Sequence, residues 1–232
     1  MKVVVFSGAG MSAESGIQTF RDSNGLWANF SIEEVATPEA WQRDSAKVQG
    51  FYNERRKQII AAQPNEAHLA IQKLEEIADV VVITQNIDDL HERAGSKNVL
   101  HLHGNIRFAK SSGPKPEKKH YPIDGWELTL NDLCDDGYPL RPHVVWFGEA
   151  VPMLDLAADE LSNADVLIVI GTSLQVYPAA SLVHLAPPSS AKYLIDPKAD
   201  VLTVPSDFHV LPMTASAGMH ALLENLSLTR KG

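Results

Sequence analysis

A small-residue loop near the N-terminus is the first segment whose residue types could do chemistry. Residues 8–12, GAGMS, follow a short apolar run and lead to Gly16. Glycines there let the backbone turn tightly and approach a pyrophosphate, whose charge amide N–H groups at a helix N-terminus can meet. The spacing departs from G-x-G-x-x-G, so a purely structural strand-to-helix turn is the alternative.

A second polar segment begins where the apolar run 80–83 ends. Residues 84–91 read TQNIDDLH. Amides and a carboxylate at the C-terminal end of a parallel strand suit ribose hydroxyls and a carboxamide, and α/β sheets bind ligands at this edge. The alternative is a capped helix start, with Asp88 or Asp89 close to the helix dipole.

Two histidines end the next apolar run, in the segment HLHG at 101–104. Strand alternation points His101 and His103 to the same side, so either is a candidate base, and a structural hydrogen-bond donor is the alternative for each. A further small-residue turn, GTSL, follows the run 166–170. Four such strand ends at one sheet edge predict a crevice that binds a ligand.

The chain does not continue as a nicotinamide dehydrogenase would. Such an enzyme has a second strand that ends in Asp or Glu about 20 residues further on, where it holds the adenosine ribose. Residues 20–35 contain no apolar run, and residues 16–22, GIQTFRD, place an arginine and an aromatic on a loop over the nucleotide. Hydride transfer is therefore disfavoured.

Short apolar runs must position these polar segments. They lack polar alternation, which is typical of strands buried on both faces of a parallel sheet, and they lie at 3–6, 80–83, 99–102, 166–170 and 193–195. Helical patterns lie between several of them, at 66–78 and 154–163. The alternation predicts the α/β class, with a doubly wound, parallel, Rossmann-like sheet.

Two stretches interrupt this alternation. Residues 31–62 carry a long helical pattern, and residues 108–146 are rich in Pro, Lys, Gly and Asp. We interpret both as insertions that form a smaller module beside the sheet. We expect one domain over 1–232, with a Rossmann-like core at about 1–30, 63–107 and 147–232.

Composition narrows the class of protein. The 232 residues include 20 Lys+Arg and 29 Asp+Glu, so the formal net charge is −9. That balance argues against a protein that coats nucleic acid or an anionic membrane, because both need clustered cations. The single cysteine, Cys134, excludes an internal disulfide, and no run approaches the roughly 18 apolar residues of a membrane span. We expect a cytoplasmic protein, and the oligomeric state is left open.

Together the motifs resemble those of the sirtuin family, the NAD-dependent protein lysine deacylases. The matching segments occur in family order and span nearly the whole chain: GAGxS at 8–12, GIxxFR at 16–21, TQNIDxLHxxAG at 84–95, HG at 103–104 and GTSL at 171–174.

The resemblance implies a role for each matching residue. His103 and Asn86 would be catalytic, with His103 the general base, which decides against His101. The residues implied to bind NAD are Gly8, Ala9, Gly10, Ser12, Glu14, Phe20, Arg21, Trp27, Gln85, Asn86, Ile87, Asp88, His103, Gly171, Thr172, Ser173, Asp196, Pro197, Lys198 and Ala215. Within that set, Ala9, Gly10 and Arg21 would contact phosphates, Gln85 a ribose, and Asn86 and Asp88 the nicotinamide. The residues implied to lie beside an acyl-lysine substrate are Val144, Val145, Trp146, Phe147 and Gly148.

The implied reaction consumes NAD as a co-substrate and yields free lysine, nicotinamide and O-acyl-ADP-ribose. A neutral imidazole near pH 7 suits the proton transfer assigned to His103. One alternative is an NAD glycohydrolase or ADP-ribosyltransferase on the same nucleotide site. Another is a non-enzymatic sensor of NAD or ADP-ribose, although a pure binder has little need for a base.

The chain departs from the family pattern in its cysteines. Sirtuins usually carry two Cys pairs that bind a structural zinc in the small module, and this sequence has only Cys134. A tetrahedral zinc site needs four Cys or His ligands in paired spacings, which Cys134 with His120 and His143 does not supply. We expect no zinc and no other metal, and a module held by the apolar residues Trp126, Leu128, Leu130 and Leu133.

A Tyr-x-x-Arg pair refines the expected substrate. Tyr52 and Arg55 lie three apart on the expected helix and share its face with Val48 and Ile59. The alternative is an amphipathic helix whose arginine extends to solvent. The pair resembles that of the sirtuin subgroup that accepts succinyl or malonyl groups, whose carboxylate would meet the guanidinium. Acylated lysines of proteins are therefore the expected partners, with the ranking of succinyl, malonyl and acetyl left open.

Overall fold

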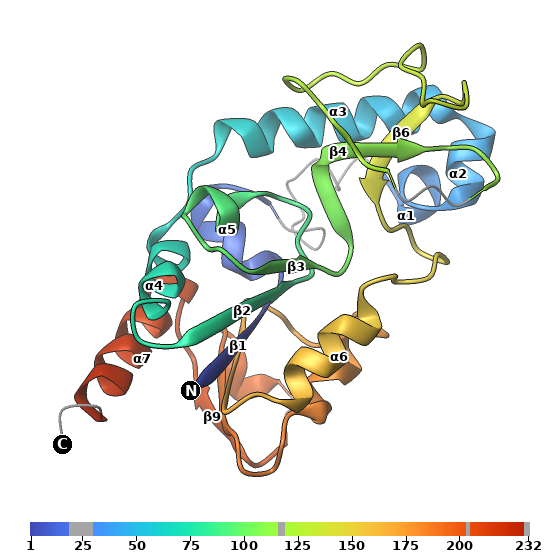
Figure 1. Ribbon diagram of the computed structural model, residues 1–232. Coiled ribbons are helices and arrows are strands. Elements are labelled where there is room, and N and C mark those ends of the chain that lie inside the picture. Colours follow the sequence, from blue (N-terminus) through green and yellow to red (C-terminus); the bar gives the residue numbers. More distant parts are fainter. Residues whose placement is uncertain (19–29, 116–118, 203–204, 230–232) are drawn as a thin grey trace.

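The computed structural model describes residues 1–18, 30–115, 119–202 and 205–229 and contains two sheets (Figure 1). The larger sheet is parallel, with the strand order β3-β2-β1-β7-β8-β9. Its strands are β1 (Lys2–Ser7), β2 (Asp79–Thr84), β3 (Val99–His101), β7 (Val166–Ile170), β8 (Ala191–Ile195) and β9 (Phe208–Leu211). The predicted α/β class is confirmed, and each of the five expected runs forms a strand.

The edge strand β9 was not expected from the sequence. Its segment, FHVL, is short, and His209 and Val210 are exposed. An exposed edge strand lacks the continuous apolar run by which the buried strands are recognised, so hydrophobicity alone does not reveal it.

Side chains alternate between the two faces of the large sheet. Val4 and Phe6 of β1 point to one face, where they pack with Leu167 and Val169 of β7 and with helix α6 (Leu154–Ser162). Val3 and Val5 point to the opposite face, toward helices α4 (Glu66–Leu74) and α7 (Ala215–Thr229), which lie side by side in Figure 1. This two-sided burial explains why the strands read as continuous apolar runs.

Helix α4 ends four residues earlier than its sequence pattern predicts. The N–H groups of Glu75, Glu76 and Ile77 bond to the carbonyls three residues before them, at 3.0–3.1 Å. Such i to i−3 bonds tighten the chain into turns. The tightened segment lets β2 begin at Asp79, beside the N-terminal strand.

The small module combines helices with the second sheet. Three helices, α1 (Ile32–Val35), α2 (Pro38–Arg43) and α3 (Ser45–Ala61), fill the stretch expected to be helical. The antiparallel sheet has the order β5-β4-β6, from β5 (Tyr121–Pro122), β4 (Gly104–Ser111) and β6 (Leu140–Val144). Figure 1 shows α3 running along β4 and β6. Short segments complete the chain: α5 (Leu90–Arg93) and the 3₁₀ helices η1 (Ala9–Ser15), η3 (Ala179–Leu185) and η4 (Ala199–Val201).

Polar contacts from α3 hold the segment that precedes β6. The buried Arg56 donates from Nε to the carbonyl of Ile106 at 2.7 Å and from one terminal nitrogen to the carbonyl of Trp126 at 2.8 Å. Asn53 exchanges two hydrogen bonds with the backbone of Leu128, at 3.0 and 3.1 Å. We call these four contacts the α3 clamp.

The expected apolar anchors of this module are largely wrong. Trp126 is 38% exposed and Leu133 54% exposed, and Leu130 is partly exposed, so only Leu128 of the four is buried. The small core that the structure shows instead consists of Ala109, Ile123, Leu128, Cys134 and Leu140, with Tyr121 packed against it. Periodicity did not identify the anchors because this segment is irregular and follows neither helical nor strand spacing.

Gly104 joins the two sheets through a conformation that favours glycine. Its φ is +81°, and an added Cβ would lie 2.2 Å from the carbonyl oxygen of His143. On the residue before it, the carbonyl of His103 accepts a 2.9 Å hydrogen bond from the N–H of Val145. The turn at 103–104 therefore places the end of β3 directly beside the segment that follows β6.

Candidate active site

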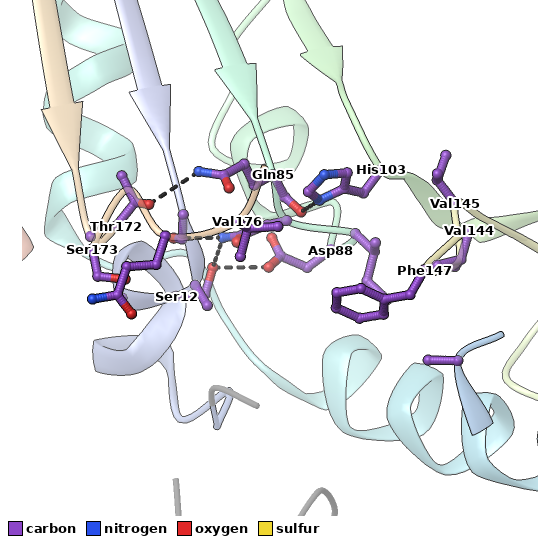
Figure 2. Close-up of a pocket in the computed structure, with 18 of the residues that line it drawn as sticks. Ser12, Gln85, Asp88, His103, Val144, Val145, Phe147, Thr172, Ser173 and Val176 are labelled. Carbon is purple, nitrogen blue, oxygen red and sulfur yellow. Dashed lines mark hydrogen bonds between the residues drawn. The ribbon is translucent and has the colours of Figure 1, made fainter. Parts of the chain in front are cut away.

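One cavity of about 730 Å³ lies at the C-terminal ends of the central strands and extends to the small module (Figure 2). Parallel α/β sheets place ligands at this edge. The expected site residues that line it are Gly8, Ala9, Gly10, Ser12, Tyr52, Arg55, Gln85, Asn86, Ile87, Asp88, His103, Val144, Val145, Trp146, Phe147, Gly148, Gly171, Thr172, Ser173, Asp196, Pro197 and Lys198.

Two expected NAD-binding residues lie outside this cavity. The carboxylate of Glu14 accepts a 2.9 Å hydrogen bond from the N–H of Ser216, at the start of α7. Ala215 is buried in the apolar cluster between α4, α7 and the sheet. Both residues therefore connect η1 and α7 to the fold and do not line the cavity. Phe20, Arg21 and Trp27 lie outside the described residues.

The glycines after β1 permit two turns to touch. A Cβ on Gly8 would lie 2.6 Å from the Cβ of Thr172, and one on Gly10 would lie 2.9 Å from the Cα of Gly171. The N–H of Gly10 bonds to the carbonyl of Gly171 at 2.8 Å. The phosphate-loop and structural-turn interpretations are thus compatible, because the turn is tightly packed and also lines the cavity.

A buried polar network lies below these turns. Ser12 donates to Asp88 at 2.9 Å, and the amide of Asn86 donates to the carbonyl of Gly8 and to Ser12 Oγ, both at 3.1 Å. Figure 2 shows Ser12 and Asp88 joined in the cavity wall. Burial raises the pKa of Asp88, while the hydrogen bonds from Ser12 and from the N–H of Leu90 act to lower it. The capping alternative is therefore realised in part: the same carboxylate lines the cavity and bonds to the first turn of α5.

His103 is held in one tautomer by a backbone carbonyl. Its Nδ1 lies 2.9 Å from the carbonyl oxygen of Gln85 (Figure 2). Because a carbonyl only accepts, Nδ1 carries the proton and Nε2 keeps its lone pair. Burial lowers the pKa of His103, which favours the neutral ring. The side chain therefore presents a basic nitrogen in the wall of the cavity.

His101 occupies a different environment. The structure ends β3 at His101 and places His103 in the following turn, so the expected alternation along one strand does not apply. His101 does not line the cavity. Its ring lies between the carbonyl of Asn86 and the carboxylate of Glu92, at 3.0 and 2.7 Å.

Tyr52 and Arg55 project from α3 into the far end of the cavity. Tyr52 is 2% exposed and Arg55 9% exposed, and the guanidinium donates to the carbonyl of Gln18 at 3.1 Å. Within the described chain, the buried Nε of Arg55 has no hydrogen-bond partner. Burial lowers the pKa of Arg55 and raises that of Tyr52, so the phenol stays protonated. A cation that keeps a free donor in a buried wall is suited to an anionic group.

A stacked arginine fixes the neighbouring wall. The guanidinium of Arg141 lies 3.5 Å from the centre of the Trp146 ring and donates to both carboxylate oxygens of Glu149, at 2.7 and 2.8 Å. Glu149 also accepts from the N–H of Trp146 at 2.8 Å. These contacts hold the buried indole in place in the wall of the cavity.

Sequence reasoning missed a further set of lining residues. They are Ile32, Ala36, Ile59, Val151, Gln175, Val176, Tyr177, Pro178 and Leu202. Ile17 and Gln18 also line the cavity, within the segment 16–22 expected over the nucleotide, as does Glu149, at the end of the segment expected beside the acyl-lysine. A signal existed for Ile59, which lies four residues after Arg55 on the same helix. No periodic pattern marked the residues after Ser173, because they form a loop.

The residues present fit a dinucleotide. The N–H of Ala9, at the start of η1, has no acceptor among the described residues and lies in the cavity wall. Turns with small side chains and free N–H groups bind phosphates, because the N–H groups donate hydrogen bonds to the phosphate oxygens. Zinc is different: the described parts of the chain contain no group of three or more His, Cys, Asp or Glu side chains that could hold a metal.

Comparison with known proteins assigns the family. Residues 8–178 match the Sir2 family. An NAD-dependent protein deacylase of Bacteroides thetaiotaomicron is 48% identical over 228 residues, which cover 97% of each chain. One of Aggregatibacter actinomycetemcomitans is 55% identical over 194 residues, 84% of this chain and 92% of its own. The chain belongs to the Sir2 family.

Solved structures agree with that assignment. A Sir2 homologue in complex with NAD has a TM-score of 0.88 at 41% identity, covering 98% of this chain and 90% of its own. A Sir2 homologue in complex with ADP-ribose has a TM-score of 0.87 at 38% identity, covering 99% and 93%. Within the described parts of the chain, none of the helices has the length and apolar character that crossing a bilayer requires.

Proposed function

We propose that this NAD-dependent protein lysine deacylase of the Sir2 family accepts acyl groups ending in a carboxylate. The observation that carries the proposal is the buried Arg55 beside Tyr52 in the wall of the cavity in which His103 presents its basic nitrogen. The names of the relatives and the NAD and ADP-ribose complexes of the solved homologues support the same activity.

Different residues along the cavity would bind NAD, orient it and accept a proton. The turns at 8–10 and 171–173 and the segment 196–198 would bind the phosphates and the adenosine half of NAD. Asn86 and Asp88, fixed by Ser12, would orient the nicotinamide. When bound, NAD supplies a ribose carbon that is activated by loss of nicotinamide. His103 Nε2 would accept the proton of a ribose hydroxyl, and its hydrogen bond to Gln85 stabilises the charged ring that results.

The acyl-lysine would enter beside the segment 144–148. Val144 and Trp146 are buried, whereas Phe147 is 47% exposed and suited to contact the peptide at the mouth. Tyr52 and Arg55 lie at the inner end, together with apolar residues of α1 and α3. In this arrangement a succinyl or malonyl carboxylate would bond to the guanidinium of Arg55, and the neutral Tyr52 phenol would donate a second hydrogen bond.

Substitution of the pair tests the acyl class. Arg55→Met should lower kcat/KM for a succinyl peptide by roughly 10- to 150-fold, because a charge-assisted hydrogen bond contributes about 1.5–3 kcal/mol. Deacetylation of the same peptide should fall far less. Tyr52→Phe should act in the same direction with a smaller loss, since it removes one neutral donor and keeps the ring. Lys57→Met, on the same helix but outside the cavity, is the matched control; parallel losses on both substrates would make the pair structural.

A further inference from the structure

Two histidines attach the segment after β2 to the end of β3 through consecutive carbonyls. His103 Nδ1 contacts the carbonyl of Gln85 at 2.9 Å, and His101 Nδ1 contacts that of Asn86 at 3.0 Å. The two rings differ at Nε2. That of His103 has no partner among the described residues, whereas that of His101 lies 2.7 Å from Glu92 Oε1.

The two partners of His101 require a charged ring. A backbone carbonyl and a carboxylate both accept hydrogen bonds, so each ring nitrogen must donate, and an imidazole that donates twice is an imidazolium. The amide nitrogen of Asn105, a donor, lies 3.3 Å from Nε2 and would bond only to an unprotonated nitrogen, but this contact is longer than the 2.7 Å contact with the carboxylate. The Glu92 pair therefore dominates the environment of this nitrogen.

The surroundings of His101 favour the same protonation state. Burial acts to lower the pKa of the ring, but the hydrogen bond and charge of Glu92, the Asn86 carbonyl and the charge of Asp88 together raise it above its ordinary value. The two other titratable groups that interact with it are histidines. His91 and His143 both have lowered pKa values, so they remain neutral and do not oppose the charge.

The charged ring acts on the active site through one residue. Asn86 is fixed by its side chain to Gly8 and Ser12, and its carbonyl is bound by His101. We propose that Glu92 and His101 are positioning residues for the deacylation reaction, which hold Asn86 in its catalytic geometry from outside the cavity. This inference rests on the proposed function, and neither side chain would contact NAD or substrate.

The pair gives the pH profile two separate limbs. His103 must be unprotonated, so activity rises as the pH increases through its lowered pKa. His101 must be protonated, because the neutral ring can donate only one of its two hydrogen bonds. Activity should therefore fall as the pH increases through the raised pKa of His101. A merely structural contact would not produce this second limb.

Two variants and two controls test the pair. Glu92→Gln removes the charge but keeps an acceptor, and His101→Leu removes both donors. Glu160→Gln is the matched control for the carboxylate, because Glu160 forms an ion pair with Lys2 at similar exposure, 33% against 39%. His209→Gln, on the exposed strand β9, is the control for the histidine. kcat, KM for NAD and the thermal midpoint are measured against pH for each protein.

We expect Glu92→Gln to move the alkaline limb to lower pH by about one unit and to leave the acid limb in place. His101→Leu should lower kcat by about 10- to 100-fold, with a smaller change in KM for NAD, as expected for a displaced catalytic group. An unchanged alkaline limb in Glu92→Gln would overturn the proposal. The proposal would also be overturned if the variants and the controls lost kcat and thermal midpoint to the same extent.

A measurement that does not depend on catalysis distinguishes failure of this proposal from failure of the proposed function. The ¹⁵N shifts of the His101 ring report how many of its nitrogens carry protons. Two protonated nitrogens at neutral pH in wild type, and one in Glu92→Gln, are expected. A singly protonated wild-type ring would overturn the charged pair even in an active enzyme. A doubly protonated ring in a chain without deacylase activity would instead contradict the proposed function.

Discussion

The two sheets of this protein are stabilised in different ways, although both contribute to one cavity. The parallel sheet lies between two apolar clusters, and its strands β1, β2 and β7 are almost entirely buried. The small antiparallel sheet has a cluster of five buried residues of its own, and its Ile106 and Val144 belong to a separate apolar cluster with helices α1–α3. Beside it, the fully buried Arg56 and the nearly buried Arg141 donate to backbone carbonyls and a carboxylate.

This difference has consequences for robustness. Apolar burial is non-directional and spread over many side chains, so the loss of one methyl group is partly absorbed by its neighbours. A buried guanidinium depends on a few directed hydrogen bonds, and the loss of the donor leaves carbonyls unsatisfied. The small module should therefore respond sharply to the loss of these buried donors as well as to apolar substitutions, and the large sheet to apolar ones.

His103 lies where the two regions meet, so its substitution separates chemistry from stability. His103→Ala should lower deacylation by about 10²–10⁴-fold, the usual contribution of a general base, while NAD binding and the thermal midpoint change little. Steady-state kinetics and calorimetric titration with NAD measure the two effects. Near wild-type activity in His103→Ala together with an inactive His101→Ala would reverse the assignment.

Matched substitutions in the two regions sharpen the comparison of their stability. Leu167→Ala, in the apolar cluster of β7, should lower the free energy of unfolding by about 2–5 kcal/mol. Arg56→Met should lower it by about 3 kcal/mol, because the carbonyls of Ile106 and Trp126 lose their donor.

Hydrogen exchange distinguishes local from global effects. Arg56→Met should reduce protection mainly in β4 and the segment 121–128, and Leu167→Ala should reduce it throughout the large sheet. Glu54→Met, on the same helix and exposed, is the control. Uniform loss of protection in Arg56→Met would mean that the α3 clamp belongs to the main core.

Two buried histidines beside the large sheet should make the free energy of unfolding depend on pH in the acid range. Burial lowers the pKa of His68 to about 4, and that of the adjacent His91 is also lowered. The unfolded state binds protons first, so the stability that neutral His68 contributes should fall as the pH drops below about 6.5 and reach its full loss below about 4. His68 alone accounts for about 3 kcal/mol of this fall.

Urea unfolding at neutral and acidic pH measures this effect. His143, in the small module, has a pKa lowered to about 3 and adds to the same trend. The contribution of His68 is therefore measured by comparing wild type with His68→Gln. His68→Gln should reduce the acid-dependent loss, and His209→Gln should not. An equal pH dependence in wild type and His68→Gln would remove His68 from the account.

Zinc removal should have the smallest effect. With one cysteine in the sequence and the α3 clamp in the small module, purified protein should contain less than stoichiometric zinc. A strong chelator should change neither activity nor thermal midpoint. One tightly held zinc per chain would contradict this expectation and would point to ligands outside the described residues.

The same comparison explains what the sequence could predict. Continuous runs such as 166–170 predicted the parallel strands with near-exact bounds, because burial on both faces leaves no polar position. Motif spacing likewise predicted most residues that line the cavity, since strand ends of one sheet meet at one edge. Glu14 and Ala215 were misplaced because a motif records neighbours in sequence and not which side of a turn a side chain occupies.

The small module was predicted less well for a physical reason. Its stability depends in part on contacts between α3 and a segment 70 or more residues away, such as that of Arg56 with Trp126. Arg56 has the sequence signature of a solvated helical arginine, yet it is fully buried. Local periodicity contains no information on such partners, and Trp126, a natural anchor by residue type, faces solvent and contributes its backbone carbonyl.

Product analysis tests the central claim most directly. Purified protein is incubated with NAD and acetyl, malonyl or succinyl versions of one lysine peptide, and the products are identified by mass spectrometry. The account predicts free lysine peptide, nicotinamide and O-acyl-ADP-ribose in equal amounts, with the acidic acyl groups preferred. Nicotinamide with ADP-ribose and an unchanged acyl peptide would contradict it and would indicate an NAD glycohydrolase.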